Sequence, residues 1–199
     1  MLIRLPAARG FTLIELMITL AVLGMLIMIA LPNMGTWLQN TQIRTSAEAM
    51  QAGLQLARAE ALKRNTSVRF QLVNSLTSGC ALTTSGRDWV VSLADPSGLC
   101  NVDASDTVAP QIIQKRSSAE GSPNAVVTAT GGSSVVFNGL GRPAAGSLTE
   151  INVTNPNNGA CKTAAGNEPM RCLRIAVNAG GAVRMCDPAV DDATDPRKC

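Results

Sequence analysis

The amino-acid sequence predicts an α+β protein in which a long N-terminal helix packs on a small antiparallel β-domain. Three observations lead to this fold class. The first 64 residues hold an apolar run followed by a helical stripe, residues 65–199 contain short segments of alternating polar and apolar side chains, and glycine, proline and asparagine separate those segments. A chain of 199 residues with 46% hydrophobic side chains can form one ordinary domain, or one domain plus an appendage.

The apolar run covers residues 11–32, and Glu15 is its only charged residue. At about 1.5 Å per residue, a helix of this length spans roughly 30 Å, the thickness of a bilayer core. We therefore predict a transmembrane helix over residues 11–32, as the first half of the long helix. Residues 1–10 carry Arg4 and Arg9 but no acid, so the positive-inside bias predicts that they stay cytoplasmic.

Residues 33–64 predict an amphipathic helix that continues the apolar one beyond the membrane. Six apolar side chains recur at spacings of three and four residues and form one stripe: Ile43, Ala47, Met50, Leu54, Ala57 and Ala61. Two oppositely charged pairs lie four residues apart on the polar face: Arg44 with Glu48, and Glu60 with Arg64. Pro32 is expected to form a kink or a local break between the two helical halves.

The β-rich globular domain is predicted over residues 65–199. Seven short segments have the composition or the alternation of strands: residues 68–72, 89–93, 126–130, 135–138, 151–154, 173–177 and 182–185. Turn residues at 178–181 separate the last two segments and predict a terminal hairpin. The segments around 94–110 and 139–147 are rich in glycine, proline and asparagine and predict loops.

The six cysteines all follow the apolar run. An even number of cysteines on one side of a membrane segment indicates an oxidising compartment and disulfides, with reduced, buried thiols as the alternative. Six cysteines allow fifteen connectivities. Nearest-neighbour pairing closes loops that carry turn residues: Cys80–Cys100, Cys161–Cys172 and Cys186–Cys199. No two cysteines form a CxxC motif, which argues against thiol redox catalysis and a zinc ribbon.

The composition argues against an enzyme, and no cofactor or metal site is expected. Histidine is absent, which excludes a Ser-His-Asp triad, a Cys-His dyad and histidine-ligated zinc or haem. Four aspartates near the C-terminus lack EF-hand spacing and predict a solvated acidic tail: Asp187, Asp191, Asp192 and Asp195. The segment from Gly139 to Arg142 lacks the spacing of a phosphate-binding loop and predicts a turn.

The segment Arg9-Gly10-Phe11-Thr12-Leu13-Ile14-Glu15-Leu16 closely resembles the cleavage site of type IV prepilins and type II secretion pseudopilins. A plain signal anchor fits the hydropathy but does not account for this motif. The resemblance implies that a prepilin peptidase cuts after Gly10, removes residues 1–10 and methylates the new amine of Phe11. It also implies an assembly role for Glu15. An unpaired acid inside a membrane costs about 3 kcal/mol, so its expected partner is the Phe11 amine of a neighbouring subunit.

Further segments resemble the GspH/FimT family. They are Leu54 to Ala61 followed by Arg64-Asn65-Thr66 and Val68, then Trp89-Val90-Val91, Val136-Phe137-Asn138 with Gly141-Arg142-Pro143, and Gly181 to Cys186. This resemblance implies the type IV pilin-like fold, in which the second half of the long helix packs on the β-domain. The same arrangement follows independently from the periodicities.

The resemblance also implies a function. The chain is expected to be a minor pilin or pseudopilin that helps to initiate and assemble a type IV pilus or a type II secretion pseudopilus at its tip. The implied partners are other pilins or pseudopilins through the N-terminal helix, the prepilin peptidase and the inner-membrane assembly platform. The implied location is a single pass through the bacterial inner membrane, with the C-terminal domain in the periplasm, and then the fibre. Six cysteines and long loops favour the pilus.

A DNA-binding minor pilin of a competence pilus is the alternative function. Some FimT-like proteins resemble DNA-uptake receptors with a C-terminal Gly-Arg-x-Arg element, of which Gly181-Ala182-Val183-Arg184 keeps one arginine. Three other arginines are candidates for phosphate contacts: Arg142, Arg171 and Arg174. The aspartates that follow Arg184 would repel phosphate, and a net charge of +3 does not itself indicate a nucleic-acid binder. We therefore expect assembly rather than DNA binding.

Overall fold

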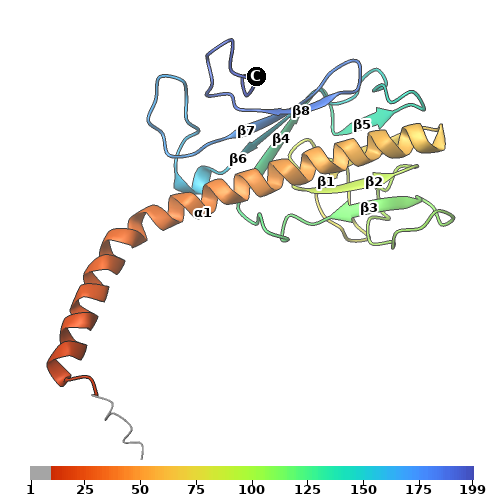
Figure 1. The fold of residues 1–199 in the computed structure, drawn as a ribbon. Coiled ribbons are helices and arrows are strands. Elements are labelled where there is room, and N and C mark those ends of the chain that lie inside the picture. The colour runs from red at the N-terminus through yellow and green to blue at the C-terminus, as the bar shows by residue number, and fades with distance from the viewer. Residues whose placement is uncertain (1–9) are drawn as a thin grey trace, which may run out of the picture. The chain divides into compact units, whose positions relative to one another are not determined.

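The computed structural model describes residues 10–199, apart from the side chains of residues 29–33 and 158. The elements follow in the order α1 (Leu13–Arg64), β1 (Val68–Val73), β2 (Asp88–Ser92), β3 (Ile112–Arg116), β4 (Val126–Thr130), β5 (Ser134–Phe137), β6 (Glu150–Thr154), a 3₁₀ turn η1 (Pro156–Asn158), β7 (Leu173–Val177) and β8 (Val183–Cys186) (Figure 1). The chain divides into two structural units, one up to Trp37 and one over Leu38–Cys199, and each is described by itself.

The first unit consists of the chain before Leu38, with the start of α1. Thr12 caps the helix, because its Oγ1 accepts the N–H of Glu15 at 3.3 Å and its carbonyl accepts the N–H of Leu16 at 3.1 Å. The helical assignment continues through Pro32 without a break. Most of the predicted leader (1–9) and the side chains at the end of the predicted membrane span (29–33) lie outside the described residues.

Among the residues that the structure describes, no helix is both long enough and apolar enough to cross a membrane.

The second unit contains two antiparallel four-stranded sheets. One has the strand order β3-β2-β1-β5, and the other has the order β4-β6-β7-β8. The predicted terminal hairpin is the β7–β8 pair, in which Ile175 lies opposite Met185. The part of α1 that belongs to this unit lies against the sheets (Figure 1), and one hydrophobic core joins its side chains to both of them. The α+β class and the antiparallel pairing are therefore confirmed.

The predicted stripe of α1 is the helix's contribution to that core. All six of its side chains are at most 1% exposed. The helix approaches the first sheet most closely at Gly53, where an added Cβ would lie 2.8 Å from the Phe70 ring and 3.0 Å from the Trp89 ring. These two rings pack on each other with centroids 5.5 Å apart. A glycine inside a helix costs about 1 kcal/mol relative to alanine, and the close approach explains why it is present here.

The polar face of the helix also agrees with the prediction. Arg44 Nε lies 2.7 Å from Glu48 Oε1, and Arg64 Nε lies 2.6 Å from Glu60 Oε2. The second pair is the more enclosed, and Arg64 also contacts Asp106 Oδ1 at 2.8 Å. The hydrogen bond from Arg64 holds the pKa of Glu60 below its ordinary value.

The seven predicted strands are present, with ends that differ by at most about one residue, but the sequence analysis missed β3. This strand has the sequence Ile-Ile-Gln-Lys-Arg, which does not alternate, and it forms the edge of the first sheet. Its pairing with β2 shifts register between Val91 and Ser92. Charged side chains are typical of edge strands, where they discourage pairing with another chain. The edge position of β3 therefore explains the polar side chains that kept its sequence from being recognised as a strand.

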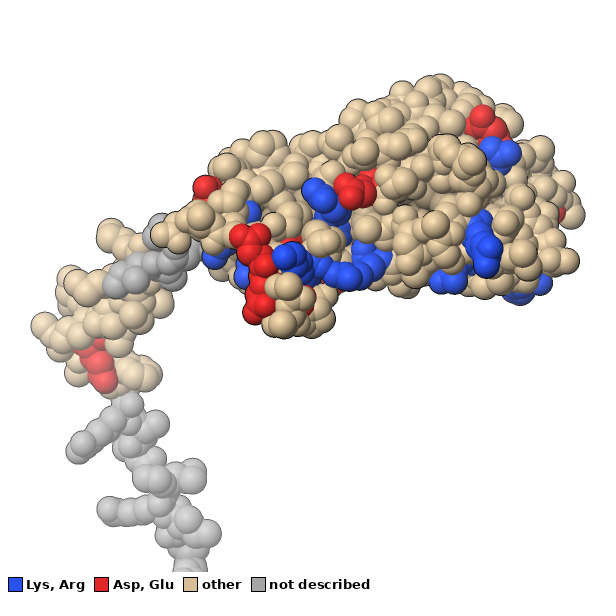
Figure 2. All heavy atoms as spheres, turned by 90° about the horizontal axis from the view of Figure 1, so that it is seen from above, with Lys and Arg blue, Asp and Glu red and all other residues tan. Residues whose placement is uncertain are grey.

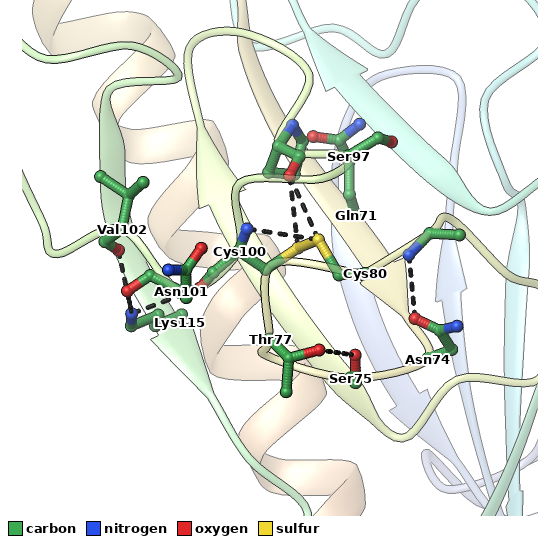
Figure 3. The surroundings of a disulfide bond; sticks show 12 residues. Gln71, Asn74, Ser75, Thr77, Cys80, Ser97, Cys100, Asn101, Val102 and Lys115 are labelled. Carbon is green, nitrogen blue, oxygen red and sulfur yellow. Dashed lines mark hydrogen bonds between the residues drawn. A yellow bond between two sulfur atoms is a disulfide. The ribbon is translucent and has the colours of Figure 1, made fainter.

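The loops that join β1 to β2 and β2 to β3 pack against the first sheet and form a second small core with it. Its buried members are Val73, Cys80, Val90, Cys100 and Ile112. Lys115 Nζ on β3 holds the second of these loops, because it donates to the carbonyl oxygens of Asn101 and Val102 at 2.9 Å each and of Cys100 at 3.3 Å (Figure 3). The predicted loop around 94–110 is therefore fixed by both a disulfide and a charged side chain.

The three disulfides join Cys80 to Cys100, Cys161 to Cys172 and Cys186 to Cys199, which is the nearest-neighbour pattern. The last two bridges hold chain that has few apolar side chains of its own. The turn at 139–142 is also present, because Asn138 Oδ1 accepts the N–H groups of Leu140 and Arg142 at 3.0 Å each. An asparagine side chain that accepts hydrogen bonds from the backbone N–H groups just after it stabilises a turn.

Candidate assembly surface

The N-terminal half of α1 presents an apolar surface with no partner among the described residues. Every described side chain from residue 10 to residue 28 is exposed. The large apolar members are Phe11, Leu13, Ile14, Leu16, Met17, Ile18, Leu20, Val22, Leu23, Met25, Leu26, Ile27 and Met28. A continuous apolar patch of this extent marks a surface for membrane or protein contact.

Glu15 is the one charged residue on this surface. It occupies the third helical position after the Thr12 cap, where the helix dipole favours a negative charge. The cap uses the backbone N–H of Glu15, and the carboxylate itself has no partner among the described residues. Gly10 and Phe11, the residues on either side of the predicted cleavage point, are exposed just before the helix begins, and Phe11 is 87% exposed.

Two family models match the chain. The model described as "Type II transport protein GspH" matches residues 46–181, well over half of the sequence. The chain belongs to the GspH family. The model described as "Prokaryotic N-terminal methylation motif" matches residues 5–31, which contain Gly10, Phe11 and Glu15. Together they identify this GspH-family chain as a pilin-like subunit, a minor pilin or pseudopilin, and the matched families are structural rather than enzymatic.

Similar solved structures include two crystal forms of the type IV minor pilin FimU from Pseudomonas aeruginosa. The P6₅ form is 18% identical, with 71% of this chain and 90% of that chain covered and a TM-score of 0.42. The P2₁ form is also 18% identical, with 72% and 87% covered and a TM-score of 0.43. Among curated proteins, the search found no match.

Two of the four arginines considered for DNA binding, Arg174 and Arg184, have partners within their own domain. Arg174 is engaged on its own sheet, because its Nε donates to Asn152 Oδ1 at 2.8 Å and its Nη1 lies 3.5 Å from Glu150 Oε2. Arg184 donates from Nη2 to the carbonyl oxygen of Lys198. Figure 2 shows basic and acidic side chains intermixed on the face that it displays. The remaining two candidates, Arg142 and Arg171, are exposed.

The prediction of a solvated acidic tail was wrong for Asp187. This residue is buried, at 7% exposure, and its Oδ1 accepts the N–H of Ala189 at 2.9 Å. Asp192 and Asp195 instead turn the tail by accepting N–H groups two residues further on, at 2.9 Å and 2.8 Å. Hydrogen bonds from Arg197 lower the pKa of Asp195 to about 2. Within the described residues no acidic cluster is arranged to hold a metal ion.

Two polar residues with structural roles were missed by the sequence analysis. Thr12 follows the pattern of a capping box, Thr-x-x-Glu before an apolar run, and that signal was available. Asn40 joins α1 to the loop closed by the Cys161–Cys172 disulfide: its Oδ1 accepts the N–H of Arg171 at 2.7 Å, and its Nδ2 donates to Pro169 O at 3.0 Å. No sequence signal identifies Asn40, because its partners lie about 130 residues away.

Proposed function

We propose that this GspH-family subunit inserts in the bacterial inner membrane through residues 11–32 and then assembles near the tip of a fibre. Residues 1–10 would be removed by the prepilin peptidase, and the amine of Phe11 would be methylated. The observation that carries the proposal is an exposed apolar helix with Glu15 as its only charge, in a chain that matches the methylation motif over residues 5–31.

Glu15 is the residue that would fix the axial position of one subunit's helix relative to the next. Its carboxylate is free of intramolecular partners among the described residues, and cleavage after Gly10 creates a positive amine at Phe11. Inside a bilayer an unpaired charge costs about 3 kcal/mol, so pairing this carboxylate with a neighbour's amine relieves the cost on both chains. The thirteen exposed apolar side chains would meanwhile pack against the same helix of other pilins, held by the assembly platform in the inner membrane.

The β-domain would lie in the periplasm before assembly and on the fibre afterwards. Three disulfides support an oxidising compartment. They also stabilise long loops, which suits a subunit exposed at a pilus tip, and for this reason we favour the type IV pilus over the type II secretion pseudopilus. The role assigned to the chain is structural and initiating, not catalytic.

The decisive experiment is intact-mass analysis of the chain extracted from membranes. We expect a mature protein that begins at Phe11 and carries one methyl group on its amine. A Gly10→Val variant is the matched control and should keep residues 1–10, because a β-branched residue replaces the glycine of the cleavage motif. Wild-type protein that retains residues 1–10 would refute the proposal.

A further inference from the structure

A shallow groove of about 360 Å³ lies between α1 and the start of β8, within the second structural unit. It is lined by Gln55, Arg58, Ala59, Leu62, Ala182 and Val183. Two turns close over one side of it: an added Cβ at Gly181 would lie 1.9 Å from Gly141 O, and one at Gly141 would lie 3.2 Å from Leu62. Both glycines have positive φ, of 80° and 71°. Four of the six lining residues have aliphatic side chains, polar and apolar surface line the groove about equally, and Arg58 is the charged residue of the lining.

Arg58 has a poorly satisfied guanidinium. Its Nε is buried and has no hydrogen-bond partner among the described residues, and its Nη2 reaches Gly180 O only at 3.5 Å. The three other cations of this part of the helix each have a carboxylate within 3.2 Å: Arg44, Lys63 and Arg64. The nearby acid Glu60 already accepts from Lys63 and Arg64. A partly desolvated charge without a counter-ion is unfavourable, so the groove is suited to an anion.

We propose that this groove receives an acidic side chain, flanked by apolar residues, from a neighbouring pilin-like subunit. The proposal rests on the proposed function, since it needs assembly with other subunits. A guanidinium binds a carboxylate through two parallel hydrogen bonds. The aliphatic walls, together with Leu140 on the adjoining turn at 74% exposure, suit the apolar neighbours of that acid. The lining holds a single cation, whereas binding to a phosphate backbone needs several, and this argues for a protein partner over a nucleic acid.

The test is photo-crosslinking in intact fibres. A photoreactive residue replaces Ala59 in the groove, and the matched control places it at Ala52, which is exposed on the same helix but outside the groove. We expect the Ala59 position to link to a peptide of another pilin-like subunit that contains an Asp or Glu. Arg58→Met should lower the yield of this product roughly tenfold, as expected for loss of a charged hydrogen-bonded pair, whereas Arg58→Lys should lower it less.

A second variant avoids any effect on folding. Gln55→Glu lies on an exposed position one helical turn from Arg58 and supplies a carboxylate from the same chain, so it should also reduce the crosslink. Exchanging the charges, with Arg58→Glu opposite a basic residue at the identified acid, should restore the product.

Three results would overturn the proposal: equal yields from Ala52 and Ala59, a yield that is insensitive to both Arg58→Met and Gln55→Glu, or a crosslink to nucleic acid. Failure of this inference is distinguishable from failure of the proposed function. Fibres that contain the chain but give no Arg58-dependent crosslink would reject the groove alone. Absence of the wild-type chain from sheared fibres would reject both.

Discussion

Replacing Glu15 with glutamine removes the charge of this residue and keeps its backbone hydrogen bond and its size, so the substitution tests the charge alone. The backbone N–H of Glu15 bonds to Thr12 Oγ1 at 3.3 Å and is unaffected by the change. Glutamine keeps the length of the side chain and is equally suited to the third helical position of a capping box. The carboxylate has no partner among the described residues, so the isolated subunit loses no ion pair there. Any large effect must therefore arise between subunits.

The size of that effect follows from the surroundings of the residue. Glu15 lies on a helix face whose large apolar side chains are all exposed and would be buried in lipid or against other helices. In the Glu15→Gln fibre, the Phe11 amine of the neighbour would have no counter-charge, at a cost of about 3 kcal/mol. This corresponds to roughly a hundredfold change in an assembly equilibrium. Glu15→Ala should behave in the same way.

The assay compares the amount of the chain in sheared fibres with the amount in membranes, and intact mass confirms that cleavage after Gly10 is unchanged. Thr12→Val is the control, because it removes the cap but keeps the charge of Glu15. Losing a cap costs about 1 kcal/mol, so its effect should stay below tenfold. Normal abundance of Glu15→Gln in fibres, with or without a loss for Thr12→Val, would refute the pairing of amine and carboxylate.

Three further predictions concern the second structural unit, Leu38–Cys199. Gly53→Ala should lower the unfolding free energy by about 1 kcal/mol, because crowding of the Phe70 and Trp89 rings outweighs the gain in helix propensity. Fluorescence of the buried Trp89 reports the unfolding transition, and an unchanged or raised stability would contradict the close approach. Lys115→Met should cost about 1–3 kcal/mol and raise hydrogen exchange mainly in residues 94–110, and uniform exchange would contradict its local role. Non-reducing peptide mapping should find the Cys186–Cys199 bridge, whose removal should cost about 3 kcal/mol for a separation of 13 residues; free thiols there would contradict it.

The helix, most strands and the disulfide pattern could be predicted because their signals are local. The buried stripe from Ile43 onward repeats with the helical period, and each strand that was found shows its composition or its alternation within five or six residues. Neighbouring cysteines could be paired because each pair encloses only a loop with turn residues.

The features that were missed depend on distant parts of the chain. Ile112–Arg116 forms a strand because it pairs with β2. Lys115 on this strand also donates hydrogen bonds to three carbonyl oxygens of the adjoining loop. Asp187 is buried because the tail after it folds back, with its N–H bonded to Arg197 O at 2.7 Å. The Arg58 groove exists only where the turns at Gly141 and Gly181 meet over the helix. Such contacts leave no periodic trace in a single sequence.

The apolar side chains of the two halves of α1 differ in burial, and we therefore expect substitutions in one half to affect folding and substitutions in the other to affect assembly. After residue 43 the stripe is buried within its own domain, whereas before residue 29 every described side chain is exposed. The domain can therefore complete its core without any partner, and the N-terminal half cannot complete its contacts alone. A substitution in the stripe, such as Leu54→Ala, should then act through stability, with a cost of about 2–5 kcal/mol. A substitution at Glu15 should leave stability unchanged and act on the fibre. Measuring both effects on both variants tests this division, and loss of domain stability in Glu15→Gln would show that the two halves are not independent.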